Sequence, residues 1–522
     1  MLDSLSEFLA PPRCRDVLAL LRGAFCLACV ALVLRACFHF APYRVGHRVR
    51  LMLFPALFCI GALAIFVYQA SWQLAGHTRK SFVSYMERHN SRPDNAAHHL
   101  IRGEILDRGG ERLAYTEADG SGRRVYEYAD ACAHVVGFRH PSEGLTGVER
   151  AADDALSGWK ELRTMEDVKE AGLAAMRPDR RIGTNVVLTI DVGLQLRACS
   201  EFDRLKRRGA AVAIDPRTGE ILLLFSSPSF DPNRFDRSLN VDPEGRLLNR
   251  ALRGRYPSGS TFKTAIAALM VECGVPQELD CPADGFRLRS WRRPIRDHEY
   301  YAYERKGLRW PGFGRIGLDT ALAKSSNAYF AQGGVLCKPA PFNAMVARLH
   351  LNESVTVYSN GVRSIDSIAG NCPPLKRAEL QELAQRSIGQ GTLLVTPLHM
   401  AMLTAAIANH GVLVPPRLAR DEPPREPERV FSRRAADRVA QAMRRVVTGG
   451  TARGIDLPGL EVRGKTGTAQ NPGGKDHAWF VCFASRPGEE PSIAVAVVVE
   501  NAGFGSAAAM PVARGILKRF FQ

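Results

Sequence analysis

A serine and a lysine three positions apart, Ser260 and Lys263, are the residues in this sequence best suited to covalent chemistry. A serine hydroxyl is a weak nucleophile at neutral pH and needs a neighbouring base. Residues i and i+3 share one face of a helix, so we expect Lys263 to lie against the Ser260 hydroxyl. The lysine must be neutral to act as a base, and burial or a nearby cation favours loss of its proton. The pair therefore predicts acyl transfer through a serine ester.

The position of this serine in the first turn of a helix would add to its reactivity. Backbone N–H groups and the positive end of the helix dipole would point toward the negative charge that develops during acyl transfer. An ordinary capping serine followed by a surface lysine would give the same four residues, Ser260-Thr-Phe-Lys263. Taken alone, so short a motif favours the ordinary interpretation.

Two further polar motifs follow the first in a fixed order. Ser325-Ser326-Asn327 begins 65 residues after Ser260, and Lys465-Thr466-Gly467-Thr468-Ala469 begins 205 residues after it. Each is weak by itself. All three in this order form the set that class A β-lactamases and penicillin-binding proteins share.

The chain resembles a class B penicillin-binding protein, a monofunctional peptidoglycan D,D-transpeptidase, from about Arg102 to its end. Five further segments carry this resemblance: Arg102-Gly-Glu-Ile-Leu-Asp-Arg108, Gly144-Leu-Thr-Gly-Val-Glu149, Leu188-Thr-Ile-Asp191 with Gln195, Asp215-Pro to Pro228-Ser-Phe-Asp-Pro-Asn233, and Ile388-Gly-Gln-Gly391 followed by Thr396-Pro-Leu398. The resemblance implies an enzyme that cross-links peptidoglycan stem peptides and is covalently inhibited by β-lactams. It implies no cofactor and no metal.

The resemblance also assigns the catalytic residues. Ser260 would be the acylated nucleophile and Lys263 its base. Ser325 would relay protons to the leaving group, Asn327 would hold the peptide amide, and Lys465 would supply positive charge.

Substrate binding is assigned by the same resemblance to Thr466, Gly467 and Thr468. The two threonines would bind the terminal carboxylate of the substrate. The backbone N–H groups of Ser260 and Thr468 would form the oxyanion hole.

The chain departs from the family pattern at several positions. Ser258 stands where proline is usual, Phe313-Gly314 replaces a common His-Gly, and His399 replaces a common glutamine. A basic and aromatic insertion runs from Trp291 to Trp310. We expect these departures to affect substrate detail and not the reaction.

An apolar segment near the N-terminus predicts a membrane anchor. Residues 51–76 contain no charged residue, and about 20 apolar residues are enough to cross ~30 Å of hydrocarbon. Arg44, Arg48 and Arg50 precede this segment, which favours a cytoplasmic N-terminus and export of everything that follows. A second candidate helix, 17–34, is interrupted by Arg22 and is left open. The predicted location is the bacterial cytoplasmic membrane, with the catalytic domain on the periplasmic side.

The elements that must position the motifs indicate an α+β fold. Apolar runs predict strands at 210–214, 221–225, 478–484 and 493–499, and helices are expected at 260–271, 397–409 and 510–521. Strands at both ends of the region, with helices between them, suggest one central antiparallel sheet flanked by helices. The expected order is a cytoplasmic N-terminus (1–50), an anchor helix (51–76), a small, mostly β pedestal (77–185) and a transpeptidase domain (186–522).

The net charge and the cysteine content limit the possible partners and disulfides of the protein. The net charge of +17 suits an anionic surface or wall, and no nucleic-acid-binding motif accompanies it, so nucleic acid is not an expected partner. Five of the twelve cysteines lie before residue 60, which leaves an odd number, seven, downstream. At least one downstream thiol must therefore be free or pair with another molecule. Cys273 and Cys281 could form a bridge, which sequence spacing alone does not settle.

Three alternatives share parts of this pattern. A bifunctional class A synthase needs a glycosyltransferase domain, for which the ~110 residues between the anchor helix and the catalytic domain are too few. A membrane-bound β-lactamase or β-lactam sensor would share the motifs but has no need of the pedestal-like segment. An inactive wall-synthesis scaffold would have no need to keep Ser260, Lys263 and Lys465. The expected partners are stem peptides or their lipid-linked precursor, β-lactams, the inner membrane, a polytopic glycan polymerase and other wall-synthesis proteins.

Overall fold

The computed structural model describes residues 60–61, 63–65, 67–68, 100–117, 119, 121–140, 142–158, 181–471 and 473–522. The candidate helix 17–34 and most of the predicted anchor 51–76 lie outside these residues. Among the residues that are described, no helix combines the length and the apolar character needed to cross a membrane. The chain divides into two compact units, 1–90 and 91–522, and the second holds all three motifs.

The centre of the second unit is a five-stranded antiparallel sheet built from distant parts of the chain. Its strand order is β10-β9-β19-β18-β17. The strands predicted at 210–214 and 221–225 are confirmed, and they form a hairpin in which β9 pairs with β10 from Ile214↔Ile221 to Gly209↔Ser227. The strands are β9 (Gly209–Ile214), β10 (Ile221–Ser227), β17 (Glu461–Ala469), β18 (His477–Ser485) and β19 (Ile493–Val499).

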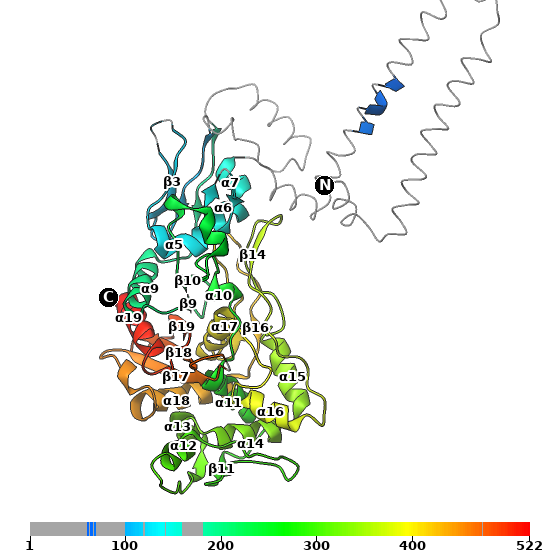
Figure 1. The fold of residues 1–522 in the computed structure, drawn as a ribbon, viewed down its shortest axis with the longest axis vertical. Helices are drawn as coiled ribbons and strands as arrows, with labels where there is room; N and C mark the ends of the chain where they lie inside the picture. Colours follow the sequence, from blue (N-terminus) through cyan, green and yellow to red (C-terminus); the bar gives the residue numbers. More distant parts are fainter. Residues whose placement is uncertain are drawn as a thin grey trace, which may run out of the picture. The chain divides into compact units, whose positions relative to one another are not determined.

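Helices cover both faces of this sheet, which explains why its strands are nearly continuous apolar runs. On one face lie α9 (Val192–Leu205) and α19 (Ala509–Phe521), and on the other lie α10 (Arg250–Arg253), α17 (Pro397–Ala408) and α18 (Arg433–Gly449) (Figure 1). Asp191 begins α9 as expected, because its carboxylate accepts a hydrogen bond from the Leu194 amide at 3.0 Å. The predicted α+β architecture with a central antiparallel sheet is confirmed.

A second, helical lobe packs beyond the β17 edge of the sheet (Figure 1). It contains α11 (Lys263–Glu272), α13 (Leu318–Lys324), α14 (Asn327–Cys337), α15 (Pro339–Arg348) and α16 (Leu380–Ser387). Helix α11 lies between α18 and α14. It is apolar around most of its circumference, and eight of its ten residues, from Lys263 to Met270, are buried.

The described part of the pedestal contains a four-stranded sheet together with helices, so this part is not mostly β. The sheet has the order β4-β3-β2-β8 and consists of β2 (Ile105–Leu106), β3 (Arg112–Thr116), β4 (Arg124–Tyr126) and β8 (Val186–Val187). Among the described residues, three short helices accompany it: α5 (Ala129–Val136), α6 (Gly147–Ala151) and α7 (Asp153–Ser157). The apolar Ala and Val positions of α5 are buried against α9 and β10, which favours a helix where the sequence suggested short strands.

A buried ion-pair network joins two of the segments that resemble the family. Arg102 lies 2.6 Å from Glu149 and 2.6 Å from Asp153, and Arg124 lies 2.7 Å from Glu149. Arg102 and Glu149 are almost fully buried. Removing one partner of such a network leaves a buried charge without compensation, typically at a cost of about 3–5 kcal/mol.

All seven cysteines downstream of the anchor segment are free thiols. The candidate bridge between Cys273 and Cys281 is absent. Cys281 is buried in β11 (Glu278–Cys281), whereas Cys273 is exposed at the end of α11. Six of the seven thiols are buried.

Candidate active site

Ser260 lies in a short 3-10 turn, Gly259–Thr261, immediately before α11. The predicted single helix from residue 260 is therefore a 3-10 turn followed by an α-helix that begins at Lys263. Because residues i and i+3 eclipse in a 3-10 turn, Ser260 and Lys263 still lie on one side. Ser260 is only partly buried, and in the described part of the chain its hydroxyl has no hydrogen-bond partner.

Two contacts hold the turn against the rest of the domain. The indole Nε1 of Trp479 donates to the Pro257 carbonyl at 3.0 Å, and the Gly259 amide donates to the Gly389 carbonyl at 2.9 Å. Gly389 has a φ of 76°, and a Cβ there would lie 1.8 Å from the Gly259 carbonyl oxygen. Only glycine fits this position, which gives a physical reason for the segment Ile388-Gly-Gln-Gly391.

Lys263 is fully buried in α11 and donates three hydrogen bonds to residues at the junction of α13 and α14. Its Nζ lies 2.6 Å from the Ser325 carbonyl oxygen, 2.6 Å from Asn327 Oδ1 and 3.4 Å from Ser325 Oγ. We expected it against the Ser260 hydroxyl, and no such bond is present among the described residues. An ammonium can only donate, so a charged Lys263 is drawn to these three oxygens, whereas a neutral amine has a lone pair for the serine proton.

The second motif forms the junction between α13 and α14. Ser325 ends α13 with a φ of 58°, in the left-handed region, which turns the chain sharply. Ser326 then caps α14, because its Oγ accepts a hydrogen bond from the Tyr329 amide at 3.2 Å. Asn327 is the first residue of α14, so its side chain and that of Ser325 both face Lys263.

An aspartate that sequence reasoning missed fixes this junction. Asp297 is 2% exposed, and its Oδ1 accepts hydrogen bonds from Ser326 Oγ and from the amides of Asn327 and Ala328. A carboxylate at the N-terminus of α14 satisfies unpaired amides and complements the helix dipole. Asp297 lies in the Trp291–Trp310 insertion, where no local motif distinguishes it from other charged residues.

The third motif lies on β17, the edge strand that faces the helical lobe. Lys465 is fully buried, and its Nζ lies 2.9 Å from Ser325 Oγ and 2.7 Å from the Thr466 carbonyl oxygen. A Cβ on Gly467 would lie 2.8 Å from Thr261 Cγ2 and 3.0 Å from Trp479 Cβ. Glycine there lets the turn that carries Ser260 approach the strand.

The two threonines of this motif differ in their surroundings. The Thr466 hydroxyl lies 2.7 Å from the Thr451 hydroxyl, a partner that no sequence motif marks. Thr468 is only partly buried. Thr468 is thus better placed than Thr466 to meet a ligand without first exchanging a hydrogen bond.

Burial dominates the electrostatics of the two lysines. It lowers the pKa of Lys263 to about 7, against the opposing effect of the carboxylates of Asp297 and Glu299. Burial also lowers the pKa of Lys465 well below its usual value, and the positive charge of Lys263 lowers it further. Two ammonium groups that share one hydroxyl repel each other, so protonation of one lysine disfavours protonation of the other.

The departures from the family pattern are accommodated without loss of the site. Ser258 is buried, and its hydroxyl has no hydrogen-bond partner in the described part of the chain. His399 is buried in α17 and completes a capping box with Thr396, and burial lowers its pKa to about 4. His298 and His477 pack against Phe504 and Tyr256, with ring centroids 5.6 Å and 5.5 Å apart.

Two family models match the chain. The penicillin-binding protein transpeptidase domain matches residues 209–518, which include all three motifs and the central sheet. The penicillin-binding protein A dimerisation domain matches residues 102–175. The matched residues contain four of the five segments on which the resemblance was based, and the segment Leu188–Asp191 with Gln195 lies between the two matches.

Curated relatives point to the same enzyme class. The peptidoglycan D,D-transpeptidase MrdA of Acinetobacter baumannii is 30% identical over 463 residues, which cover 74% of this chain and 64% of that protein. PbpA of Mycolicibacterium smegmatis, another peptidoglycan D,D-transpeptidase, is 30% identical over 458 residues, which cover 80% of this chain and 88% of that protein.

Solved structures of similar chains share the fold, and one of them is an acyl-enzyme complex with a β-lactam. Penicillin-binding protein A from M. tuberculosis, as its ceftriaxone acyl-enzyme complex, is 28% identical with a TM-score of 0.70, covering 82% of this chain and all of that one. Pseudomonas aeruginosa PBP2 is 29% identical with a TM-score of 0.67, covering 81% of this chain and 95% of that one. The chain belongs to the class B penicillin-binding proteins, the peptidoglycan D,D-transpeptidases that β-lactams acylate.

Proposed function

We propose that the residues of the three motifs divide the transpeptidase reaction among themselves, with Ser260 as the nucleophile. The observation that supports this is the convergence on Ser325: Lys263 and Lys465 lie 3.4 Å and 2.9 Å from its hydroxyl. Motifs 65 and 205 residues from Ser260 are thereby linked in one hydrogen-bonded cluster beside it. Such a cluster can move a proton between nucleophile and leaving group.

In the acylation step, neutral Lys263 takes the Ser260 proton as Oγ attacks the carbonyl carbon of the penultimate D-alanine. The bond to the terminal D-alanine nitrogen breaks, and Ser325 passes its proton to that nitrogen and takes the proton that Lys263 received from Ser260. Asn327 holds the peptide amide, and Thr466, Gly467 and Thr468 bind the terminal carboxylate end. The backbone N–H groups of Ser260 and Thr468 stabilise the oxyanion.

In the second step an amine of another stem peptide attacks the ester. The carbon–Oγ bond breaks, an amide cross-link forms, and the proton lost by the amine returns to the Ser260 oxygen. The lysine pair suits both steps, because a substrate carboxylate near β17 favours the charge on Lys465 and leaves Lys263 neutral. Lys465 thus supplies positive charge in the substrate complex, although burial opposes that charge in the free enzyme.

The long life of a β-lactam adduct distinguishes this function from that of a β-lactamase. Class A β-lactamases position water with a glutamate in a Glu-x-x-Leu-Asn motif. Between Asn327 and Lys465 the only Leu-Asn pair is Leu351-Asn352, and Arg348 stands where the glutamate would be. Asn352 is engaged elsewhere, since its Nδ2 donates to the Cys372 carbonyl at 2.7 Å.

We therefore expect the penicilloyl adduct of the purified chain to last many minutes. The measurement is intact mass after acylation with penicillin and removal of the excess drug. Turnover of the adduct within seconds would make the protein a β-lactamase. An inactive scaffold would form no adduct at all.

Access to wall substrate requires that the catalytic unit lie outside the cytoplasm, and we propose this orientation from Arg44, Arg48 and Arg50 ahead of the apolar segment 51–76. A reporter that is active only outside the cytoplasm, fused after Gln522, should be active. The same fusion with a reporter that works only in the cytoplasm is the control. A signal from this second reporter would contradict the orientation.

The proposed partners follow from this location. The membrane surface and the lipid-linked precursor lie on the substrate side, and a polytopic glycan polymerase would supply the strands to be cross-linked. The chain's excess of positive charge, +17, suits an anionic membrane and wall.

A further inference from the structure

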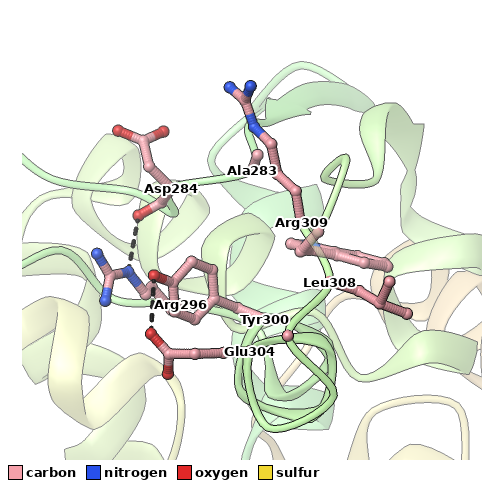
Figure 2. A pocket seen from close by; sticks show the side chains of 9 residues that line it. Ala283, Asp284, Arg296, Tyr300, Glu304, Leu308 and Arg309 are labelled. Carbon is pink, nitrogen blue, oxygen red and sulfur yellow. Dashed lines mark hydrogen bonds between the residues drawn. The ribbon is translucent and has the colours of Figure 1, made fainter.

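The Trp291–Trp310 insertion contains a pocket beside the active site that the reaction described so far does not use. Its volume is about 400 Å³, and Figure 2 shows the side chains that line it. The lining residues come from both ends of the excursion between β11 and β12 (Gly314–Gly317) and from α12 (His298–Glu304). They are Ala283, Asp284, Arg296, Tyr300, Glu304, Gly307, Leu308, Arg309 and Trp310.

The pocket adjoins the catalytic cluster through its backbone. The Asn327 Nδ2 donates to the Arg296 carbonyl at 2.9 Å, and Asn327 Oδ1 accepts from Lys263 Nζ. His298 packs edge-on against Phe504, and Tyr300 of the same helix, α12, lines the pocket. Phe504 is followed by Gly505, which lies against Gly467 of β17. The insertion therefore contacts α14 directly and approaches β17 through the segment Phe504-Gly505.

The charges in this pocket are of both signs and are not paired with each other. In the part of the chain that the structure describes, Arg296 and Arg309 form no ion pair with any carboxylate. Arg296 donates to the Asp284 carbonyl oxygen at 3.3 Å and stacks over the Tyr300 ring at 4.1 Å. The Tyr300 hydroxyl donates to Glu304 at 3.3 Å. In Figure 2, Arg296, Tyr300 and Glu304 lie on one side of the pocket, and Leu308 and Arg309 lie on the other.

The aromatic wall of the pocket is fixed in place. Trp310 packs edge-on against Tyr303 and against Phe313, with ring centroids 5.0 Å apart in both pairs. Guanidinium groups bind carboxylates in a bidentate manner, and flat aromatic faces stack on amide planes and aliphatic stems. Asp284 and Glu304 also line the pocket, and their carboxylates disfavour a polyanion and provide acceptors for an ammonium group. The lining thus suits a peptide that carries both free carboxylates and a free amine.

We propose that this pocket binds the acceptor stem peptide through its carboxylates, with Arg309 and Arg296 as the recognising groups. This inference rests on the proposed transpeptidase function. The donor peptide already has binding groups in that proposal, namely Asn327 and the β17 threonines, whereas the acceptor has none. The pocket adjoins Asn327 through the Arg296 carbonyl, which places a bound acceptor next to the residue proposed to hold the donor's amide.

The test compares Arg309→Glu with Arg305→Glu in the purified full-length chain. Arg305 ends α12, is exposed and does not line the pocket, so both variants change the net charge equally. The acceptor probes are a synthetic stem tripeptide with a side-chain amine and free carboxylates, and glycine, which is too small to reach the pocket. The donor is a pentapeptide that ends in D-Ala-D-Ala.

Arg309→Glu should raise KM for the tripeptide acceptor about tenfold or more, because a charge-assisted bidentate contact becomes a repulsion. KM for glycine, donor acylation and penicillin labelling should stay at wild-type values, as should every parameter of Arg305→Glu. Arg309→Lys should give a KM for the tripeptide between those of the wild type and Arg309→Glu. Lysine keeps the positive charge but lacks the planar guanidinium that binds a carboxylate in a bidentate manner.

An unchanged tripeptide KM in Arg309→Glu would overturn the proposal, as would equal losses with glycine or in Arg305→Glu. A loss confined to donor acylation would place the donor, not the acceptor, in the pocket and would also overturn it. Failure of the underlying function is separate, because it would appear in the wild-type chain as absence of penicillin labelling.

Discussion

Ser260→Ala should abolish covalent labelling by a fluorescent penicillin. The adduct is an ester to Ser260 Oγ, and alanine removes that atom alone. The hydroxyl has no hydrogen-bond partner among the described residues, so its loss removes no intramolecular contact and should leave the fold intact. Labelling is read on a denaturing gel, and thermal unfolding shows that the variant is folded.

The matched control is Ser238→Ala, since Ser238 is exposed and lies outside the three motifs. This variant should label like the wild type. Undiminished labelling of a folded Ser260→Ala chain would contradict the assignment of Ser260 as the nucleophile, and with it the proposed mechanism.

The acylation rate should depend on pH through Lys263. Burial lowers the pKa of this amine to about 7, and only the neutral form can accept the Ser260 proton. The neutral fraction falls about tenfold per pH unit below the pKa, so acylation should slow steadily below pH 7 and level off above it. The groups that face Lys263 are Asp297 and Glu299, which raise its pKa, and Lys465, whose charge opposes a second charge beside it.

Lys263→Ala should lower the plateau rate about 10²–10⁴-fold, the usual contribution of a positioned general base. Stopped-flow acylation with a chromogenic cephalosporin from pH 5 to pH 9 measures both effects. Lys324→Ala is the control, because Lys324 is exposed one residue before Ser325 and donates nothing to the cluster. A variant of Lys263 that kept the wild-type rate and pH profile would exclude its role as the base.

Much of the catalytic unit could be predicted because its signals are local. Four strands of the central sheet, β9, β10, β18 and β19, are largely apolar runs buried on both faces, and the Asp215–Glu220 turn joins the first two. Asp191 caps α9 through its own side chain. The three motifs sit at element ends, in the turn before α11, at the α13–α14 junction and on β17, where a few residues determine the geometry.

The remaining features depend on contacts between distant segments, which sequence spacing does not show. Asp297 reaches Ser326 from an insertion with no motif, and Thr451 reaches Thr466 from the loop after α18. The partners of Lys263 are set by where α14 packs against α11. The helices of the pedestal form because α5 finds an apolar surface on α9 and β10.

The burial of the cysteines has a consequence for the compartment in which this enzyme is proposed to work. Outside the cytoplasm, oxidants and disulfide donors react with thiolates, not with thiols. Burial raises the pKa of the Cys281 and Cys372 thiols to about 11, and that of Cys132 to about 12. At neutral pH almost none of these sulfurs is ionised, and none of the three is reached by solvent. In the folded enzyme these buried thiols can therefore stay reduced in an oxidising environment, where they pack as apolar groups. An unfolded chain would expose all seven thiols, which could then form incorrect disulfides.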